Sequence, residues 1–352
     1  MRAPSIRSSA ILPFVVVCHS VIAGVAENSH SVPGTAQSAQ ESERHPDAGA
    51  TPPAGAIRHD LREHGLYGEL YVPAHMRPLP ALVAIGGAEG GLDTVSKMAV
   101  TLVPRGYAVL ALAYFGEPGL PSTLESVPLE YFHHAVEWLA RQPGVDPARL
   151  GMIGWSRGAE AALLVASREP KIHAVIAVSP SSYVWVGENF KRPPRAAWTV
   201  GGEPIPYVTP RPPKNYRPGM SIKDLLSAFL AEAIRRPDAA IPVQRIHGAI
   251  LLITGTDDHL WPSSEMAEQI SQRLRAADFP YIYRTLSYRG AGHVAFVGNP
   301  AALASMDAQS LVNPMLGGTF AADTAAWKAD WPKALLFLSE SLGSRSAHAG
   351  LR

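Results

Sequence analysis

Cysteine is almost absent from this sequence, with a single thiol, Cys18, in 352 residues. An excess of one charge sign is absent too, because 31 Lys and Arg residues face 30 Asp and Glu residues, for a net charge of +1. Nucleic acid and acidic membrane surfaces are therefore not expected as partners. The apolar run near the N-terminus, Ala10 to Val17, is far shorter than the roughly 20 residues of a membrane-spanning helix, so stable membrane insertion is not expected.

The first 26 residues have the composition of an export signal. Arg2 and Arg7 precede the apolar run, and Gly24 and Ala26 have the −3 and −1 spacing of a signal-peptidase site. We therefore expect a signal peptide over residues 1–26 and a periplasmic or secreted protein. Cleavage after Ala26 would remove Cys18, which would exclude disulfides and cysteine catalysis. Lipoprotein cleavage at Cys18 is the alternative.

The rest of the chain divides into a polar segment and one long domain. Residues 27–55 are rich in Ser, Ala, Pro, Glu and His without apolar periodicity, which predicts a flexible tether. Residues 56–345 alternate strand and helix patterns, and repeated βα units predict a mostly parallel sheet with helices on both faces. The expected strands are 66–72, 81–85, 107–113, 150–154, 174–178, 250–254 and 283–287, and the expected helices are 94–103, 129–141, 159–167, 222–234, 264–276 and 325–342.

One long interval interrupts this alternation, about seventy residues where an ordinary crossover needs far fewer. We interpret residues 182–247 as a cap insertion over the carboxyl ends of the strands, where α/β sheets bind ligands. Three aromatic side chains in it, Tyr183, Trp185 and Phe190, are candidates for an acyl pocket. Their alternative role is in the apolar core.

The segment Gly154-Trp155-Ser156-Arg157-Gly158 matches G-x-S-x-G, the nucleophile elbow of α/β-hydrolases. An apolar strand pattern precedes it and small helix-forming residues follow it. Serine on such a strained strand-to-helix turn needs flanking glycines, because a Cβ there would collide with neighbouring backbone. The segment predicts Ser156 as a nucleophile.

Its partners are expected in the order acid, then histidine. Asp257 and Asp258 follow the apolar strand 250–254, and His293 lies in a small-residue loop after the last predicted strand. His293 would take the serine proton and return it to the leaving group, and a buried acid would orient the imidazole. We favour Asp258 for the acid and interpret Asp257 as a solvated or turn-capping neighbour.

An oxyanion hole needs two backbone N–H groups. We expect one from Arg157, directly after the nucleophile, and the other from Ala88 or Gly87 in the glycine-rich loop after strand 81–85. That loop lacks the lysine and spacing of a phosphate-binding P-loop. No cofactor is expected, and no metal either, because His133 and His134 lack metal-ligand spacing.

These residues carry a family resemblance. From about Gly65 to the C-terminus, the sequence resembles the catalytic domain of the acyl-CoA thioesterase and bile acid-CoA:amino acid N-acyltransferase family, with dienelactone-hydrolase-like esterases as the next nearest relatives. The resemblance rests on IGGAEGGL, GYAVLALAYFGEPGLP, PLEYFHHAVEWL, GWSRGAEAALLVAS, TGTDDHLWPS and YRGAGH.

The resemblance implies a Ser/Asp/His triad, as in the family's thioesterases, whereas its amino-acid transferases use a cysteine nucleophile. Ser156 therefore favours hydrolysis of an acyl ester or thioester through an acyl-serine intermediate. Two features depart from the family. Its characterised members carry an N-terminal β-sandwich where the tether is predicted here, and the export signal predicts a compartment where free CoA is not expected. The alternatives are an exported carboxylesterase, a peptidase or amidase, and a non-catalytic binding protein on the same scaffold.

Overall fold

The computed structural model describes residues 50–74, 78–189, 193–209, 222–296, 298–299 and 316–343. The predicted signal peptide, most of the predicted tether and Phe190 lie outside the described residues. Among the helices that the model describes, none has both the length and the apolar character needed to cross a membrane.

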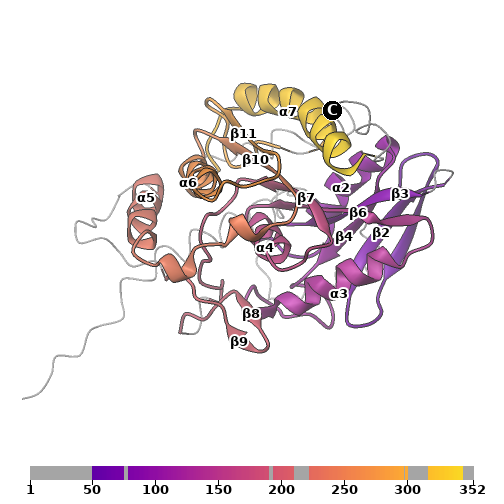
Figure 1. Cartoon of the computed structure of the whole chain (residues 1–352), viewed down its shortest axis with the longest axis horizontal. Helices are drawn as coiled ribbons and strands as arrows, with labels where there is room; N and C mark the ends of the chain where they lie inside the picture. The colour runs from indigo at the N-terminus through magenta and orange to yellow at the C-terminus, as the bar shows by residue number, and fades with distance from the viewer. Residues whose placement is uncertain are drawn as a thin grey trace, which may run out of the picture.

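An eight-stranded sheet forms the centre of the protein (Figure 1). Its strands are β1 (Ala56–Leu61), β2 (Tyr67–Pro73), β3 (Leu79–Ile85), β4 (Ala108–Ala113), β6 (Val145–Trp155), β7 (Ile172–Val178), β10 (Ala249–Gly255) and β11 (Tyr283–Tyr288). They lie in the order β1-β2-β4-β3-β6-β7-β10-β11. The pairs from β4 to β11 are parallel, and β1 and β2 add an antiparallel edge.

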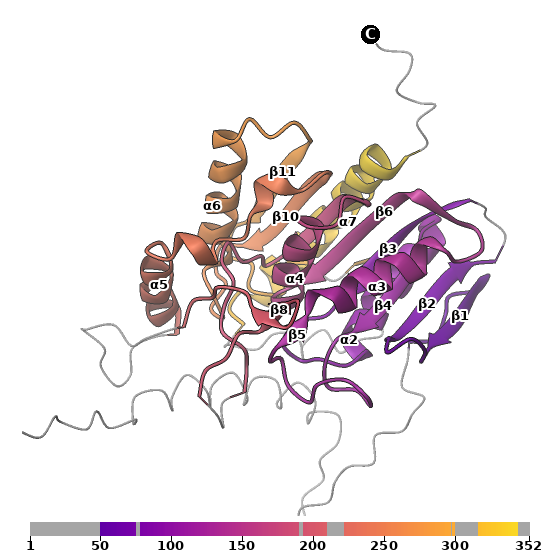
Figure 2. The ribbon, with the colours of Figure 1, turned by 60° about the horizontal axis from the view of Figure 1, so that its bottom comes forward.

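Helices cover both faces of this sheet (Figure 2). The helices are α2 (Asp93–Leu102), α3 (Leu129–Ala140), α4 (Arg157–Ala166), α5 (Ile222–Ala233), α6 (Ser263–Ala276) and α7 (Phe320–Leu342). Most of the buried apolar residues of α3, α4 and α6 belong to one cluster, and most of those of α2 and α7 belong to another. The predicted α/β architecture is confirmed.

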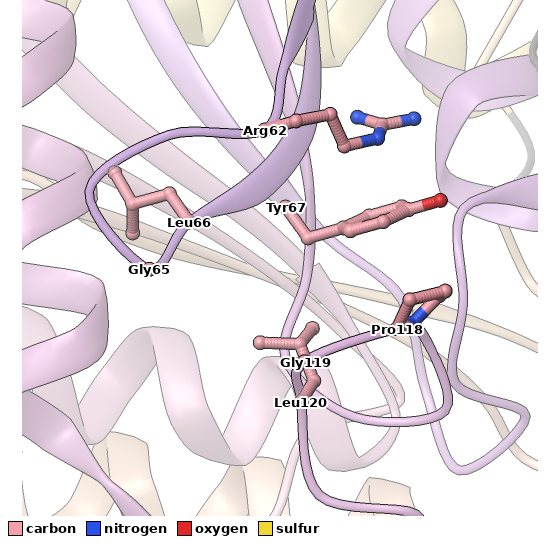
Figure 3. A pocket seen from close by; sticks show the side chains of 7 residues that line it. All are labelled: Arg62, Gly65, Leu66, Tyr67, Pro118, Gly119 and Leu120. Carbon is pink, nitrogen blue, oxygen red and sulfur yellow. The ribbon is translucent and has the colours of Figure 1, made fainter.

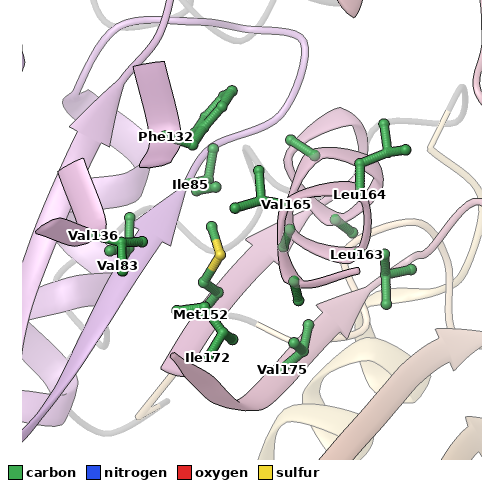
Figure 4. Close-up of a cluster of buried hydrophobic side chains, with 14 of the residues drawn as sticks. Val83, Ile85, Phe132, Val136, Met152, Leu163, Leu164, Val165, Ile172 and Val175 are labelled. Carbon is green, nitrogen blue, oxygen red and sulfur yellow. The ribbon is translucent and has the colours of Figure 1, made fainter. Parts of the chain in front are cut away.

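The two clusters arise from the alternation of side chains along each strand. In β3, Val83 and Ile85 join the cluster under α3 and α4, where Phe132 lies beside them (Figure 4). Leu82 and Ala84 point to the opposite face and belong to the cluster of α2 and α7. Strands buried on both faces need continuous apolar runs, which is why these strands could be predicted from sequence.

The described residues of the interval between β7 and β10 form one helix and four short elements. They are β8 (Trp198–Val200), β9 (Glu203–Pro204), α5, and the 3₁₀ turns η2 (Pro237–Ala239) and η3 (Val243–Arg245). β8 and β9 form a second small sheet with β5 (Val127–Pro128). Apolar side chains from this interval, including Leu226 and Phe229, form a separate buried cluster that also includes Met266 of α6.

Candidate active site

The candidate nucleophile lies on a strained turn between β6 and α4. Ser156 has φ 57° and ψ −119°, a conformation that costs energy for a residue with a Cβ. Its N–H donates to Val178 O at 2.9 Å, which ties the turn to β7. A Cβ on Gly154 would lie 2.2 Å from Gly158 O, and one on Gly158 would lie 2.2 Å from Gly86 O. Only glycine therefore fits at either position, as the motif predicts.

The carboxylate of Asp258, in the loop after β10, is buried and bonded at both oxygens. Oδ1 accepts the N–H groups of Leu260 and Trp261 at 3.0 and 3.2 Å. Oδ2 accepts the Ser263 hydroxyl at 2.6 Å and lies 2.9 Å from His293 Nδ1. Asp258 is thus held in place by its own loop and the start of α6, with one oxygen directed at the imidazole.

Asp257 occupies a different environment. Its side chain is 40% exposed, whereas that of Asp258 is 2% exposed. One Asp257 oxygen lies 3.0 Å from His259 Nε2. Of the two acids, Asp258 is the one that the structure brings to His293.

His293 is buried in the loop that follows β11. Its carbonyl oxygen accepts the Ser179 hydroxyl at 2.6 Å and the Trp155 indole N–H at 3.1 Å. The rings of Trp155 and Trp261 lie against the imidazole, with centroids 5.6 and 6.0 Å away. Nδ1 is engaged by Asp258, and within the described residues Nε2 has no hydrogen-bond partner. Nε2 is thus the nitrogen left to act as a base.

The glycine-rich loop after β3 lies beside the elbow. The Tyr114 hydroxyl lies 3.1 and 2.9 Å from the carbonyl oxygens of Gly86 and Gly87, and its hydrogen bond to them holds the loop in place. The Gly87 N–H donates to Glu89 Oε1 at 2.9 Å. The Ala88 N–H has no acceptor among the described residues, so of the two predicted loop donors it is the one not already engaged.

Arg157, the first residue of α4, offers its backbone N–H without an intrahelical acceptor. Its guanidinium is buried, which is rare for an arginine side chain. It lies 2.8 Å from Glu160 and 3.5 Å from Glu188, and it donates to Val186 O at 3.0 Å. The contact with Val186 O shows that the side chain faces the interval after β7. Glu160, on the next helical turn, gives the guanidinium a buried counter-charge.

The predicted acyl-pocket aromatics are largely enclosed. Tyr183 and Trp185 are 8% and 7% exposed and pack with Leu226 and Phe229 in the cluster of the interval after β7. The Trp185 indole N–H donates to Ser181 Oγ at 2.8 Å. Both rings thus contribute to the core of that interval, the alternative that the sequence left open.

An open pocket of about 350 Å³ lies at the carboxyl edge of β4 (Figure 3). Its lining includes Leu66 and the loop 118–120, and the Arg62 guanidinium stacks 3.7 Å above the Tyr67 ring. Residues of the candidate triad do not line it.

Away from the candidate triad, three side chains of the kinds that bind metal ions lie close together, two on α3 and one just after α4. His133, Glu137 and Glu169 each offer an atom within 4.8 Å of the others. His133 Nδ1 lies 2.5 Å from Glu169, and Glu137 pairs with the Lys171 ammonium. Since that cation already neutralises Glu137, the cluster has the character of an ion-pair network.

A serine on a strand-to-helix turn, with an acid and a histidine after later strands of a mostly parallel sheet, defines an enzyme of the α/β-hydrolase class. The fold is shared with an α/β-hydrolase from a Medee basin deep-sea metagenome library, at TM-score 0.52 and 15% identity over 82% of this chain and 99% of that one. It is also shared with a puromycin-hydrolyzing peptidase of Mycobacterium tuberculosis, at TM-score 0.51 and 16% identity over 82% of this chain and 39% of that one.

The chain belongs to the BAAT / acyl-CoA thioester hydrolase C-terminal family, whose model matches residues 127–344. It is 30% identical over 297 residues to acyl-coenzyme A thioesterase 1 of Mus musculus, covering 84% of this chain and 67% of the relative. It is also 30% identical over 294 residues to acyl-coenzyme A amino acid N-acyltransferase 1 of Mus musculus, covering 82% of this chain and 66% of the relative. The chain thus spans about two thirds of these relatives.

Sequence reasoning missed several residues of this site. Ser263 and Ser179 bond to Asp258 and to the His293 carbonyl, and nothing in the sequence marks a serine for such a role. Glu89 is the only charged residue between Gly86 and Gly91, but the sequence does not show in which direction its side chain points.

Proposed function

We propose that this protein is a serine hydrolase that cleaves an acyl thioester or ester through an acyl-serine intermediate. The observation that carries the proposal is the buried contact between His293 Nδ1 and Asp258 Oδ2 at 2.9 Å, formed by loops that follow two neighbouring strands, β10 and β11. The strained turn at Ser156 and membership of the family support the same reaction.

In the proposed first step, Ser156 Oγ attacks the substrate carbonyl carbon while His293 Nε2 takes the hydroxyl proton. Asp258 keeps the other imidazole proton on Nδ1 and stabilises the imidazolium. The carbonyl oxygen becomes an oxyanion, which the N–H groups of Arg157 and Ala88 stabilise.

Collapse of the tetrahedral intermediate breaks the bond from the carbonyl carbon to the leaving sulfur or oxygen, and His293 gives its proton to that atom. Water then attacks the acyl-serine ester with the same base. This second half releases the acid and restores the serine hydroxyl.

Thioesters are the first substrates to test, because several of the matched relatives are named as acyl-coenzyme A thioesterases. The predicted export signal favours a second candidate, an exported carboxylesterase. We propose a periplasmic or secreted location on that signal alone. The mass of the mature protein from a secreting host tests this, since removal of 26 residues supports export and an intact N-terminus contradicts it.

The decisive experiment compares matched p-nitrophenyl esters, acyl-CoA thioesters and peptide chromogens on the purified protein. Ser156→Ala is expected to abolish turnover and fluorophosphonate labelling while the unfolding temperature stays within a few degrees of the wild type. Turnover by the variant at the wild-type rate would refute the mechanism. A higher kcat/KM for acyl-CoA would support the thioesterase, and ester cleavage without CoA activity would support the carboxylesterase.

A further inference from the structure

The side chain of Glu89 folds back over its own loop toward the nucleophile. Oε1 accepts the Gly87 N–H at 2.9 Å. Oε2 lies 2.7 Å from the point that a Cβ on Gly87 would occupy, and Ser156 Cβ lies 3.2 Å from that same point. Glu89 Oε2 and Ser156 Cβ therefore lie within about 6 Å of each other across Gly87, which has no side chain to fill the space between them.

Glu89 is a partly buried acid, and it forms no ion pair within the described residues. Burial raises the pKa of its carboxyl to about 7, and the negative charge of Glu188 raises it further. The shift is opposed by hydrogen bonds from the Gly87 N–H and from its own backbone N–H, and by the charge of His293. Glu117 approaches the same loop at Gly91. The guanidinium of Arg157, the residue after the nucleophile, is engaged by Glu160 and Glu188. These neighbours leave the neutral acid as the favoured form around neutral pH and below.

We propose that Glu89 acts in its protonated form as a third oxyanion donor, with Oε2–H donating to the oxygen that becomes negative. The proposal rests on the proposed acyl-serine mechanism. Oε1 remains an acceptor for the Gly87 N–H when Oε2 carries the proton, so the loop contact is kept. Glu89 forms and breaks no covalent bond, and its proton stays on Oε2 throughout.

The sign of the pH effect follows from this role. Below about pH 7 the carboxyl is neutral and donates; above it, the carboxylate has no proton to donate and repels the oxyanion. The value of kcat/KM is therefore expected to fall on the alkaline side with a midpoint near pH 7.

Three variants test this role on the best p-nitrophenyl ester between pH 5 and 9. Glu89→Gln keeps an N–H donor and an acceptor but cannot ionise. It is expected to retain activity within about tenfold at pH 6 and to lose the alkaline decline. Glu89→Ala removes the donor, and a loss of about 10²- to 10³-fold in kcat is expected, the usual effect of deleting one oxyanion donor. The control Glu117→Gln changes a neighbouring acid and is expected to keep the wild-type profile.

An alkaline decline that persists unchanged in Glu89→Gln would overturn the proposal, as would a Glu89→Ala variant within threefold of wild type. Unfolding temperatures of all variants separate lost chemistry from lost folding. These failures differ from failure of the proposed function. In that case the wild-type protein itself would show no turnover that depends on Ser156, whatever residue stood at position 89.

Discussion

Asn in place of Asp258 is the substitution that most directly tests the arrangement around His293. The amide has nearly the shape of the carboxylate, but one of its ends donates hydrogen bonds instead of accepting them. Asp258 Oδ1 receives two backbone N–H groups, and Oδ2 receives the Ser263 hydroxyl and faces His293 Nδ1. The amide of Asp258→Asn therefore has two possible orientations.

With its NH₂ group in the Oδ1 position, the amide would face two backbone donors that cannot rotate away. Each buried donor left without an acceptor costs about 1–3 kcal/mol. With the NH₂ group in the Oδ2 position, the Ser263 hydroxyl can turn to accept, and the amide donates to His293 Nδ1. The second orientation is expected because it avoids the unpaired backbone groups.

That orientation places the imidazole proton on Nε2, the nitrogen that must accept the serine proton. The wrong tautomer costs about 10⁴-fold in kcat in a serine protease with this arrangement. About 5 kcal/mol of transition-state stabilisation corresponds to that loss. We expect a similar loss here, with KM and the unfolding temperature little changed.

The assay is steady-state hydrolysis of the best p-nitrophenyl ester, with the unfolding temperature measured in parallel. Asp257→Asn is the matched control, since that side chain is 40% exposed and lies beside His259. It is expected to retain activity within about threefold. A large loss in Asp257→Asn together with near-normal kcat in Asp258→Asn would refute the assignment of the acid.

Two further substitutions test the packing around the elbow. Gly158→Ala places a Cβ 2.2 Å from Gly86 O, so the loop that supplies Ala88 must shift. Since misplacement of about 1 Å costs about 10²-fold in rate, a loss of that size in kcat/KM is expected. The control Gly201→Ala meets no atom within 4 Å and should keep full activity, so equal activity of the two variants would contradict the packing argument. Glu160→Ala leaves the buried Arg157 without its 2.8 Å partner and is expected to lower the free energy of unfolding by about 3–5 kcal/mol in urea titration; a change below 1 kcal/mol would mean that Glu188 alone neutralises the guanidinium.

The sequence predicted the strands that are buried on both faces, and of the two edge strands it predicted β11 but missed β1. β3, β4 and β10 are continuous apolar runs, and their positions were predicted to within two residues. β1 was missed because three of its six residues, including His59 and Asp60, are exposed at the edge of the sheet, where no apolar pattern is needed. β8 and β9 are too short to carry a periodic signal. Helix α7 begins five residues before its predicted start, because the Thr319 side chain caps it by accepting the Ala322 N–H.

Some residues of the candidate active site could likewise be predicted from the sequence, and others could not. Ser156, Asp258 and His293 could be selected because their order follows from chain topology. Glu89 could not, since its relation to the nucleophile depends on a side chain that folds back across a glycine. The role of the aromatic residues in the interval after β7 could not be predicted either. The sequence around Tyr183 and Trp185 does not distinguish side chains that line a pocket from side chains that pack in a core.

The buried Arg157 and Glu160 pair joins the interval after β7 to the helix of the elbow. Arg157 donates to Val186 O, and Glu160 accepts the Trp185 N–H at 3.2 Å and the Trp198 indole N–H at 2.7 Å. The first part of the interval is thus attached, through its backbone at 185 and 186 and through the Trp198 side chain, to the helix that begins at the nucleophile. Substitutions farther along the interval leave these bonds in place, so they are expected to leave the rate of the chemical step unchanged.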